Sequence, residues 1–109
     1  MRKIETQMNA AIAAGRNWAS ANTSVQMDGE VATVFLHGNK IAEIGEGYIQ
    51  IWDGGWQSNT TKSRINAIFD GNGIQGEGVF QKNWSWFARI AQGSGEFATV
   101  PFFSGMRFN

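Results

Sequence analysis

Residues 24–52 read SVQMDGEVATVFLHGNKIAEIGEGYIQIW, and this stretch decides the fold. Three groups of turn-forming residues divide it at nearly regular intervals: Asp28-Gly29, Gly38-Asn39 and Gly45-Glu46-Gly47. Such residues accept the positive φ angles that tight hairpin turns require. The segments between them are short and rich in Val, Ile, Phe, Tyr and Trp, which is typical of β-strands. We therefore expect four antiparallel strands that pair in sequence order.

The residues before this meander have the period of an amphipathic helix. Residues 3–19 are predicted to be helical, with an apolar stripe of Ile4, Met8, Ala11, Ile12, Gly15 and Trp18. A glycine inside a helix costs about 1 kcal/mol against alanine, so Gly15 indicates the close approach of another backbone. Residues 31–36 are apolar on both alternating faces, which predicts a central strand that is covered on both sides. The first helix is the expected cover for one of them.

The second half of the chain is predicted to hold one short helix and one hairpin. Residues 61–69 have an Ile65, Ile68 and Phe69 face after a threonine cap, and they end at a glycine-rich loop. Residues 79–103 are expected to form a C-terminal hairpin, with a first strand at 79–91 and a return strand from residue 97. Pro101 lacks an N–H, which places the return strand at an edge. The fold class is thus α+β, mostly β, in a single domain over residues 1–109.

Composition narrows the classes of function. The chain has 109 residues with nine basic and nine acidic side chains, so net charge predicts no general attraction to nucleic acid or to membranes. No cysteine is present, which excludes disulfides and thiolate metal sites and fits a reducing compartment. There is no apolar run long enough to span a membrane. We expect a soluble, cytoplasmic protein.

No arrangement of residues predicts catalysis. His37 is the only histidine, and it lies beside a turn with no cysteine and no GxSxG motif in the chain. Neither metal-ligand spacing nor a phosphate-binding glycine loop is present. We expect no enzyme activity, no metal and no cofactor; an enzyme that uses His37 would need an acid or base within hydrogen-bonding reach of it.

A binding surface is easier to derive, because basic residues exceed acidic ones after residue 60 and aromatic residues lie among them. Cations interleaved with aromatic rings are what single-stranded nucleic acid requires, through phosphate contact and base stacking. The candidate contacts are Lys62, Arg64 and Lys82 for phosphate, with Trp84 and Trp86 for stacking.

Four segments resemble a family of small proteins from marine metagenomes and T7-like cyanophages: MRKIE at 1–5, VFLHGNKIA at 34–42, TTKSRINA at 60–67 and GVFQKNW at 78–84. The resemblance implies an Sm-like (LSm/Hfq-like) fold, in which an N-terminal helix lies on a strongly bent, five-stranded antiparallel sheet or small barrel. It also implies a homo-oligomeric ring of about five or six subunits. The usual Sm loop signatures and the Lys-His element of Hfq-like proteins are missing, so no RNA-contacting residue is carried over.

Two hypotheses follow for the function. The first is a non-catalytic, phage-derived oligomeric module that binds RNA or single-stranded DNA in the cytoplasm of the infected host. The alternative is a structural or protein-interaction ring that modulates a host or phage protein without nucleic acid, with the tryptophans filling the subunit contacts. Exposure of Trp84 and Trp86 beside cations favours the first hypothesis, and their burial between subunits favours the second.

Overall fold

The structure, a computed structural model, describes residues 1–109 as two helices and nine strands. In chain order the elements are α1 (Lys3–Ala14), β1 (Trp18–Ser20), β2 (Thr23–Asp28), β3 (Val31–Leu36), β4 (Asn39–Gly45), β5 (Tyr48–Ile51), α2 (Asn59–Asn72), β6 (Gly78–Lys82), β7 (Ser85–Ala91), β8 (Phe97–Pro101) and β9 (Met106–Phe108). All strand pairs are antiparallel. The α+β, mostly β class is confirmed.

The predicted meander forms most of the larger sheet, whose strand order is β1-β2-β3-β4-β5-β9. Strands β2 to β5 pair in sequence order, as the turn spacing predicts. At the β3–β4 turn His37 and Gly38 have φ angles of 51° and 78°, which is the pattern of a type I′ turn. Strand β9 returns from the C-terminus to pair with β5, so the meander is extended by β1 on one side and β9 on the other.

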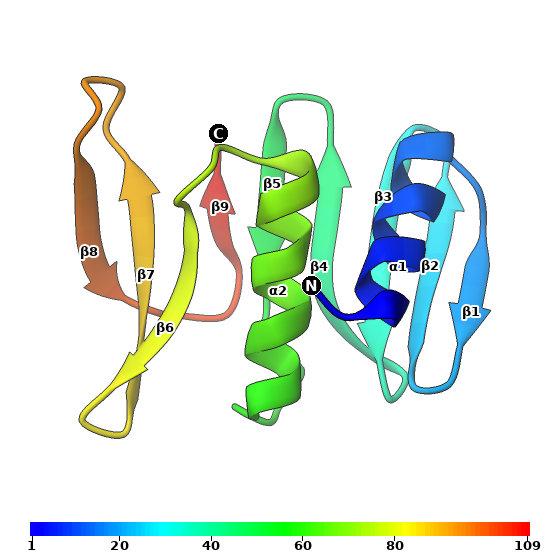
Figure 1. Ribbon diagram of the computed structural model, residues 1–109, viewed down its shortest axis with the longest axis horizontal. Coiled ribbons are helices and arrows are strands. Elements are labelled where there is room, and N and C mark those ends of the chain that lie inside the picture. The colour runs from blue at the N-terminus through cyan, green and yellow to red at the C-terminus, as the bar shows by residue number, and fades with distance from the viewer.

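Both helices lie on the same face of the larger sheet (Figure 1). They run parallel, because Asn9 of α1 donates to the carbonyl oxygen of Ala67 at 2.9 Å and Glu5 pairs with Arg64 further back along both helices. Along β3, the alternate residues Ala32, Val34 and Leu36 are buried under the helical layer, whereas Val31, Thr33 and Phe35 on the other face are only half-buried. The expectation that a layer covers both faces of this strand is wrong, since the second helix joins the first.

Helix α1 is shorter than predicted and ends at Ala14. Gly15 has a φ of 65° and caps the helix in the left-handed conformation, where glycine has no steric penalty. A Cβ at Gly15 would meet no atom within 4 Å, so the inference of a close backbone approach is wrong. The chain beyond Gly15 turns back, and Trp18 lies in β1 rather than in the helical stripe.

Helix α2 begins earlier than predicted, and its cap is Ser58 instead of a threonine. The Ser58 hydroxyl accepts a hydrogen bond from the backbone N–H of Thr61 at 3.1 Å, an interaction worth about 1 kcal/mol to a helix. A short connector joins the end of β5 to this cap, so α2 starts at the same end of the molecule as the β3–β4 turn (Figure 1).

The C-terminal hairpin is a separate three-stranded sheet of order β6-β7-β8. The predicted strand at 79–91 is two strands joined by a turn at Asn83 and Trp84. Strand β8, which ends at Pro101, is an edge strand as predicted. The observed sheets of six and three strands differ from a single bent sheet of five, because β6, β7 and β8 pair with each other and only β9 joins the meander.

One cluster of 19 buried apolar residues joins the helices and both sheets. Phe69 of α2 packs edge-on against Phe108 of β9, with ring centroids 4.7 Å apart. Neither helix is long and apolar enough to cross a membrane.

Candidate nucleic-acid interface

The tip of the β6–β7 hairpin carries the most exposed aromatic side chain of the chain, Trp84, which is 92% exposed. Asn83 and Trp84 occupy the two central positions of the turn with φ angles of 51° and 66°. Left-handed backbone costs a bulky L-residue about 1–2 kcal/mol, and asparagine or glycine is the usual occupant. A tryptophan that is both strained and unburied contributes little to folding, which makes it a candidate for recognition.

Lys62 and Lys82 lie beside this tip. Lys62 projects from the first turn of α2, and its Nζ donates to Oε1 of Gln81 on β6 at 3.2 Å. Lys62, Gln81, Asn83 and Trp84 line one shallow depression, and Lys82 is exposed at the end of β6. Of the five residues that the sequence singles out, the structure therefore brings Lys62 and Trp84 together, and it places Lys82 exposed just before the same turn.

Trp86 is only two residues from Trp84 but lies in the interior. It is 4% exposed and packs edge-on against Phe102, with ring centroids 5.3 Å apart. Its Nε1–H is buried without a hydrogen-bond partner. Because its ring is covered by its own chain, Trp86 is removed from the candidate contact surface.

Arg64 is also in the interior, at 4% exposure, where it links α2 to α1 and to the start of β2. Its guanidinium donates to Oε2 of Glu5 at 2.8 Å, to Oγ1 of Thr23 at 3.0 Å and to Oδ1 of Asn22 at 3.3 Å. With its donors directed to these three side chains, Arg64 has a structural role, and we remove it too from the contact surface.

The buried ion pair shapes the titration of Glu5. Burial by itself raises the pKa of this carboxyl, but hydrogen bonds from Ser63, Arg64 and the backbone of Arg2, together with the charge of Arg64, outweigh it and hold the pKa below its ordinary value of 4.5. The Ser63 hydroxyl donates to Oε2 at 2.6 Å and the Arg2 N–H to Oε1 at 3.2 Å. Glu5 thus remains ionised near neutral pH although it is only 2% exposed.

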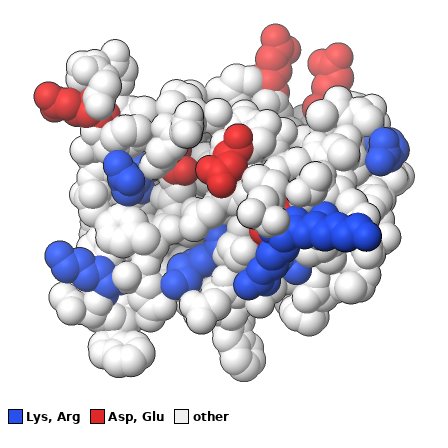
Figure 2. Space-filling model, viewed as in Figure 1, with Lys and Arg blue, Asp and Glu red and all other residues white.

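Although the net charge is zero, basic and acidic side chains gather at opposite ends of the molecule. The end where the helices start carries the cations Arg2, Lys3, Lys62 and Lys82. The opposite end holds the β2–β3, β4–β5 and β7–β8 turns, whose acids are Asp28, Glu30, Glu46 and Glu96. Figure 2 shows most Lys and Arg side chains across the lower half of one face and most Asp and Glu side chains across the upper half. We call the first of these the basic end.

Trp56 is a further exposed aromatic at the basic end that the sequence analysis did not select. It lies in the connector between β5 and α2 and is 76% exposed. Its backbone is fixed, since its carbonyl oxygen accepts hydrogen bonds from the Thr61 hydroxyl at 3.2 Å and the Ser58 N–H at 3.1 Å. The available signal was a tryptophan inside a polar, glycine-bearing connector, where a core residue is not expected.

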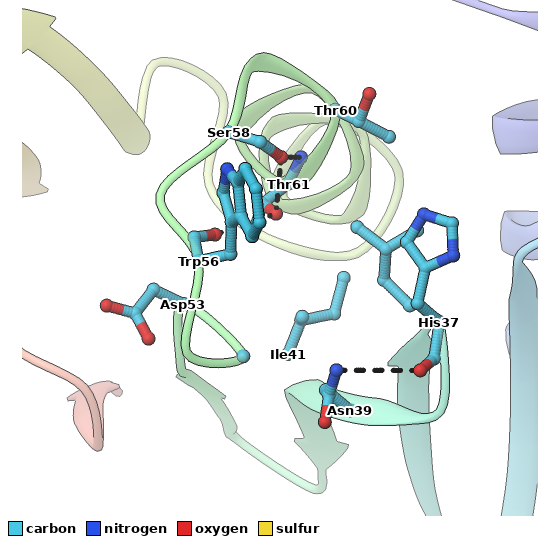
Figure 3. Close-up of a pocket in the computed structure, with 10 residues that line it drawn as sticks. His37, Asn39, Ile41, Asp53, Trp56, Ser58, Thr60 and Thr61 are labelled. Carbon is cyan, nitrogen blue, oxygen red and sulfur yellow. Dashed lines mark hydrogen bonds between the residues drawn. The ribbon is translucent and has the colours of Figure 1, made fainter.

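Beside Trp56 is a pocket of about 480 Å³ between the β3–β4 turn and the start of α2 (Figure 3). His37, the candidate for a catalytic role, lines it as an exposed side chain. The hydrogen bonds of His37 involve its backbone: its N–H donates to the Asn22 carbonyl oxygen at 2.7 Å, and its own carbonyl oxygen accepts from Asn39. No three His, Asp or Glu side chains come together as a metal-ligand cluster.

Comparisons with known proteins identify the chain by family. No curated protein and no solved structure matches it. A model of the family described as Kyanoviridae Gp96 protein matches residues 1–109, which confirms the expected kinship with cyanophage proteins. Because this match covers every residue, the chain belongs to the Kyanoviridae Gp96 protein family.

Proposed function

We propose that this protein is a non-catalytic module that binds single-stranded nucleic acid at its basic end. Lys62 and Lys82 contact phosphates, and Trp84 stacks on a base. The observation that carries the proposal is the Trp84 indole, 92% exposed in a strained turn, with Lys62 lining the same depression and Lys82 exposed at the end of the strand that enters the turn. Stacking on an aromatic side chain is worth about 1–3 kcal/mol per base and tolerates any sequence.

The charges predict modest, salt-dependent affinity. Because the chain has no net charge, attraction to a polyanion arises only from the local cations of the basic end. Two phosphate contacts on a single strand give a slope of about −1.4 in a plot of log affinity against log salt concentration. Backbone contact and stacking do not read sequence, so RNA and single-stranded DNA are held by the same groups.

The test is fluorescence anisotropy with labelled oligouridine and oligothymidine over a salt series. The Trp84→Ala variant is expected to bind about tenfold more weakly. The Lys62→Gln/Lys82→Gln double variant is expected to lose most of the salt dependence. Arg16→Gln is the matched control, since Arg16 is an exposed cation just after the far end of α1. If wild-type protein gives no salt-dependent anisotropy change with either oligonucleotide, the proposal fails.

A second candidate is a homo-oligomeric ring that acts through protein contacts, as the resemblance to Sm-like proteins implies. Two observations favour it: strand β8 has an open edge, and the half-buried Val31 and Phe35 lie on the sheet face that no helix covers. Open edges invite pairing with another chain. Light scattering at micromolar concentration is expected to give the mass of about five or six subunits, and a mass of one chain would exclude the ring.

A further inference from the structure

The pocket beside Trp56 has the shape and lining of a site for a flat ring. Its volume of about 480 Å³ lies within the ordinary range for small-molecule sites. Two apolar side chains from the larger sheet, Leu36 and Ile41, line it and are 5% and 1% exposed. Because these residues are fixed in strands β3 and β4, this part of the lining is preformed.

Two aromatic rings stand on opposite sides of the pocket. Figure 3 shows the Trp56 indole on one side, the His37 imidazole on the other and the Ile41 side chain directed between them. The backbones of both ring-bearing residues are held in place, Trp56 by the start of α2 and His37 by the Asn22 carbonyl oxygen at 2.7 Å. A planar ligand that enters between them meets an aromatic ring on either side, at little cost in backbone ordering.

The hydrogen-bonding groups of the lining fall into two sets. The Ser58 and Thr61 hydroxyls bond each other at 2.9 Å, and the Asp53 carboxylate accepts from the Gly55 N–H at 2.8 Å and from Gln57 at 3.3 Å. These groups are engaged in holding the connector and the helix cap. The Thr60 hydroxyl and the Asn39 amide oxygen make no hydrogen bond within the chain, but Figure 3 shows both directed away from the space between the two rings. The polar groups of the lining are therefore engaged or turned outward, and the pocket holds a ring through its aromatic and apolar side chains.

We propose that this pocket takes one unstacked nucleobase of the strand bound at the basic end. Aromatic side chains on which a base can stack are a principal feature by which proteins hold splayed bases, and this pocket combines two aromatic rings with an apolar lining. The inference rests on the proposed function and extends it from one base site to two.

The first turn of α2 connects the two base sites. Thr60 and Thr61 line the pocket beside Trp56, whereas the next residue, Lys62, lines the depression beside Trp84. A strand whose backbone crosses this turn meets the Lys62 ammonium with a base on either side. One base then enters the pocket and another stacks on Trp84.

The experiment uses nucleoside monophosphates, which offer a base without a strand. Amide chemical shifts of ¹⁵N-labelled protein are followed during titration with each of the common monophosphates to millimolar concentration. Wild-type protein is expected to show saturable shifts at Asn39, Gly54 and Thr60, and the same shifts in the Trp84→Ala variant. The Thr60→Trp variant, which fills the pocket, is expected to lose them. Asn59→Trp is the matched control, because Asn59 is exposed on the same turn and does not line the pocket.

A second arm measures oligonucleotide binding by the same variants. Thr60→Trp is expected to weaken binding of base-bearing oligothymidine about tenfold and to leave binding of a fully abasic strand of equal length unchanged. If no monophosphate gives saturable shifts at the pocket, or if Thr60→Trp binds both strands as wild type does, the pocket is not a base site. The proposed function then still stands wherever Trp84→Ala weakens strand binding, and it falls separately if no strand binds at all.

Discussion

Lys62 and Arg64 are two residues apart in one helix, and Trp84 and Trp86 are two residues apart in one hairpin, yet each pair is divided between surface and interior. Lys62 lies beside the exposed tip and Arg64 is buried against α1. Trp84 is 92% exposed and Trp86 is 4% exposed. The same residue types thus stabilise the interior on one side of the backbone and stay exposed to solvent on the other.

The two divisions have different causes. In a helix, residues two apart point to nearly opposite sides, so Lys62 and Arg64 separate by geometry alone. In a strand, residues two apart share a face, and Trp84 would lie with Trp86 if the strand were continuous. The turn at Asn83 and Trp84 breaks that relation and directs the first ring into solvent.

The sharpest test of the interior side is Arg64→Met. It leaves the Glu5 carboxylate buried without its partner, and removal of one member of a buried pair costs about 3–5 kcal/mol. Urea unfolding measures the change, and Lys62→Met is the surface counterpart, expected within about 0.5 kcal/mol of wild type. The Glu5→Gln/Arg64→Met double variant is expected to recover much of the loss. If Lys62→Met destabilises as much as Arg64→Met, the contrast between the two cations is wrong.

A change of similar size is expected for Trp86→Ala, which empties a large site in the core and costs about 3–5 kcal/mol. Trp84→Ala at the tip is expected to change unfolding free energy by less than about 0.5 kcal/mol. Trp86→Phe refines the comparison, since it also removes the buried N–H that has no partner and should cost far less than Trp86→Ala. If Trp86→Phe and Trp86→Ala lower the free energy of unfolding equally, the indole N–H has a hydrogen-bond partner after all.

Low pH is expected to destabilise the fold through the buried Glu5 carboxylate. The pKa of Glu5 is lowered in the folded state, so its contribution is complete above the ordinary value of 4.5 and is lost as pH falls through the lowered pKa. The urea midpoint of wild-type protein is expected to fall below about pH 4.5, and that of Glu5→Gln to fall less steeply. Parallel pH profiles for the two proteins would contradict this role of Glu5.

The smallest expected change in the free energy of unfolding is a stabilisation. Trp84→Gly relieves left-handed strain at the tip and should stabilise the fold by about 1 kcal/mol, while strand binding falls to the level of Trp84→Ala. The measurements are urea unfolding and anisotropy on the same preparation. A variant that binds as wild type does would remove Trp84 from the interface.

The sequence predicted the elements that local chemistry specifies. Glycine-bearing groups marked the meander turns, although the central pair of the β3–β4 turn is His37-Gly38 and not the predicted Gly38-Asn39, and Pro101 marked an edge. The β6–β7 turn was not predicted, because Asn83 and Trp84 adopt positive φ without a glycine and residues 79–91 therefore resembled one strand. The burial of Arg64 depends on Glu5, 59 residues away, and no local pattern carries that information. Of the candidate contacts, Lys62 and Trp84 line one depression and Lys82 is exposed beside the turn. Trp56 was not selected, because it lies in a polar connector.

Asn66 of α2 has a consequence for how copies of this protein can add to one another. Its side chain donates to the Val79 carbonyl oxygen at 2.9 Å and accepts from the Val79 N–H at 2.8 Å, as a neighbouring strand would. The outer edge of β6 is therefore already hydrogen-bonded to α2. A strand from another copy can pair with the small sheet only at β8. Two copies that pair β8 to β8 therefore form a closed two-fold pair, whereas the ring proposed above requires β8 of one copy to pair with a different edge of the next, β1 or β9 of the larger sheet.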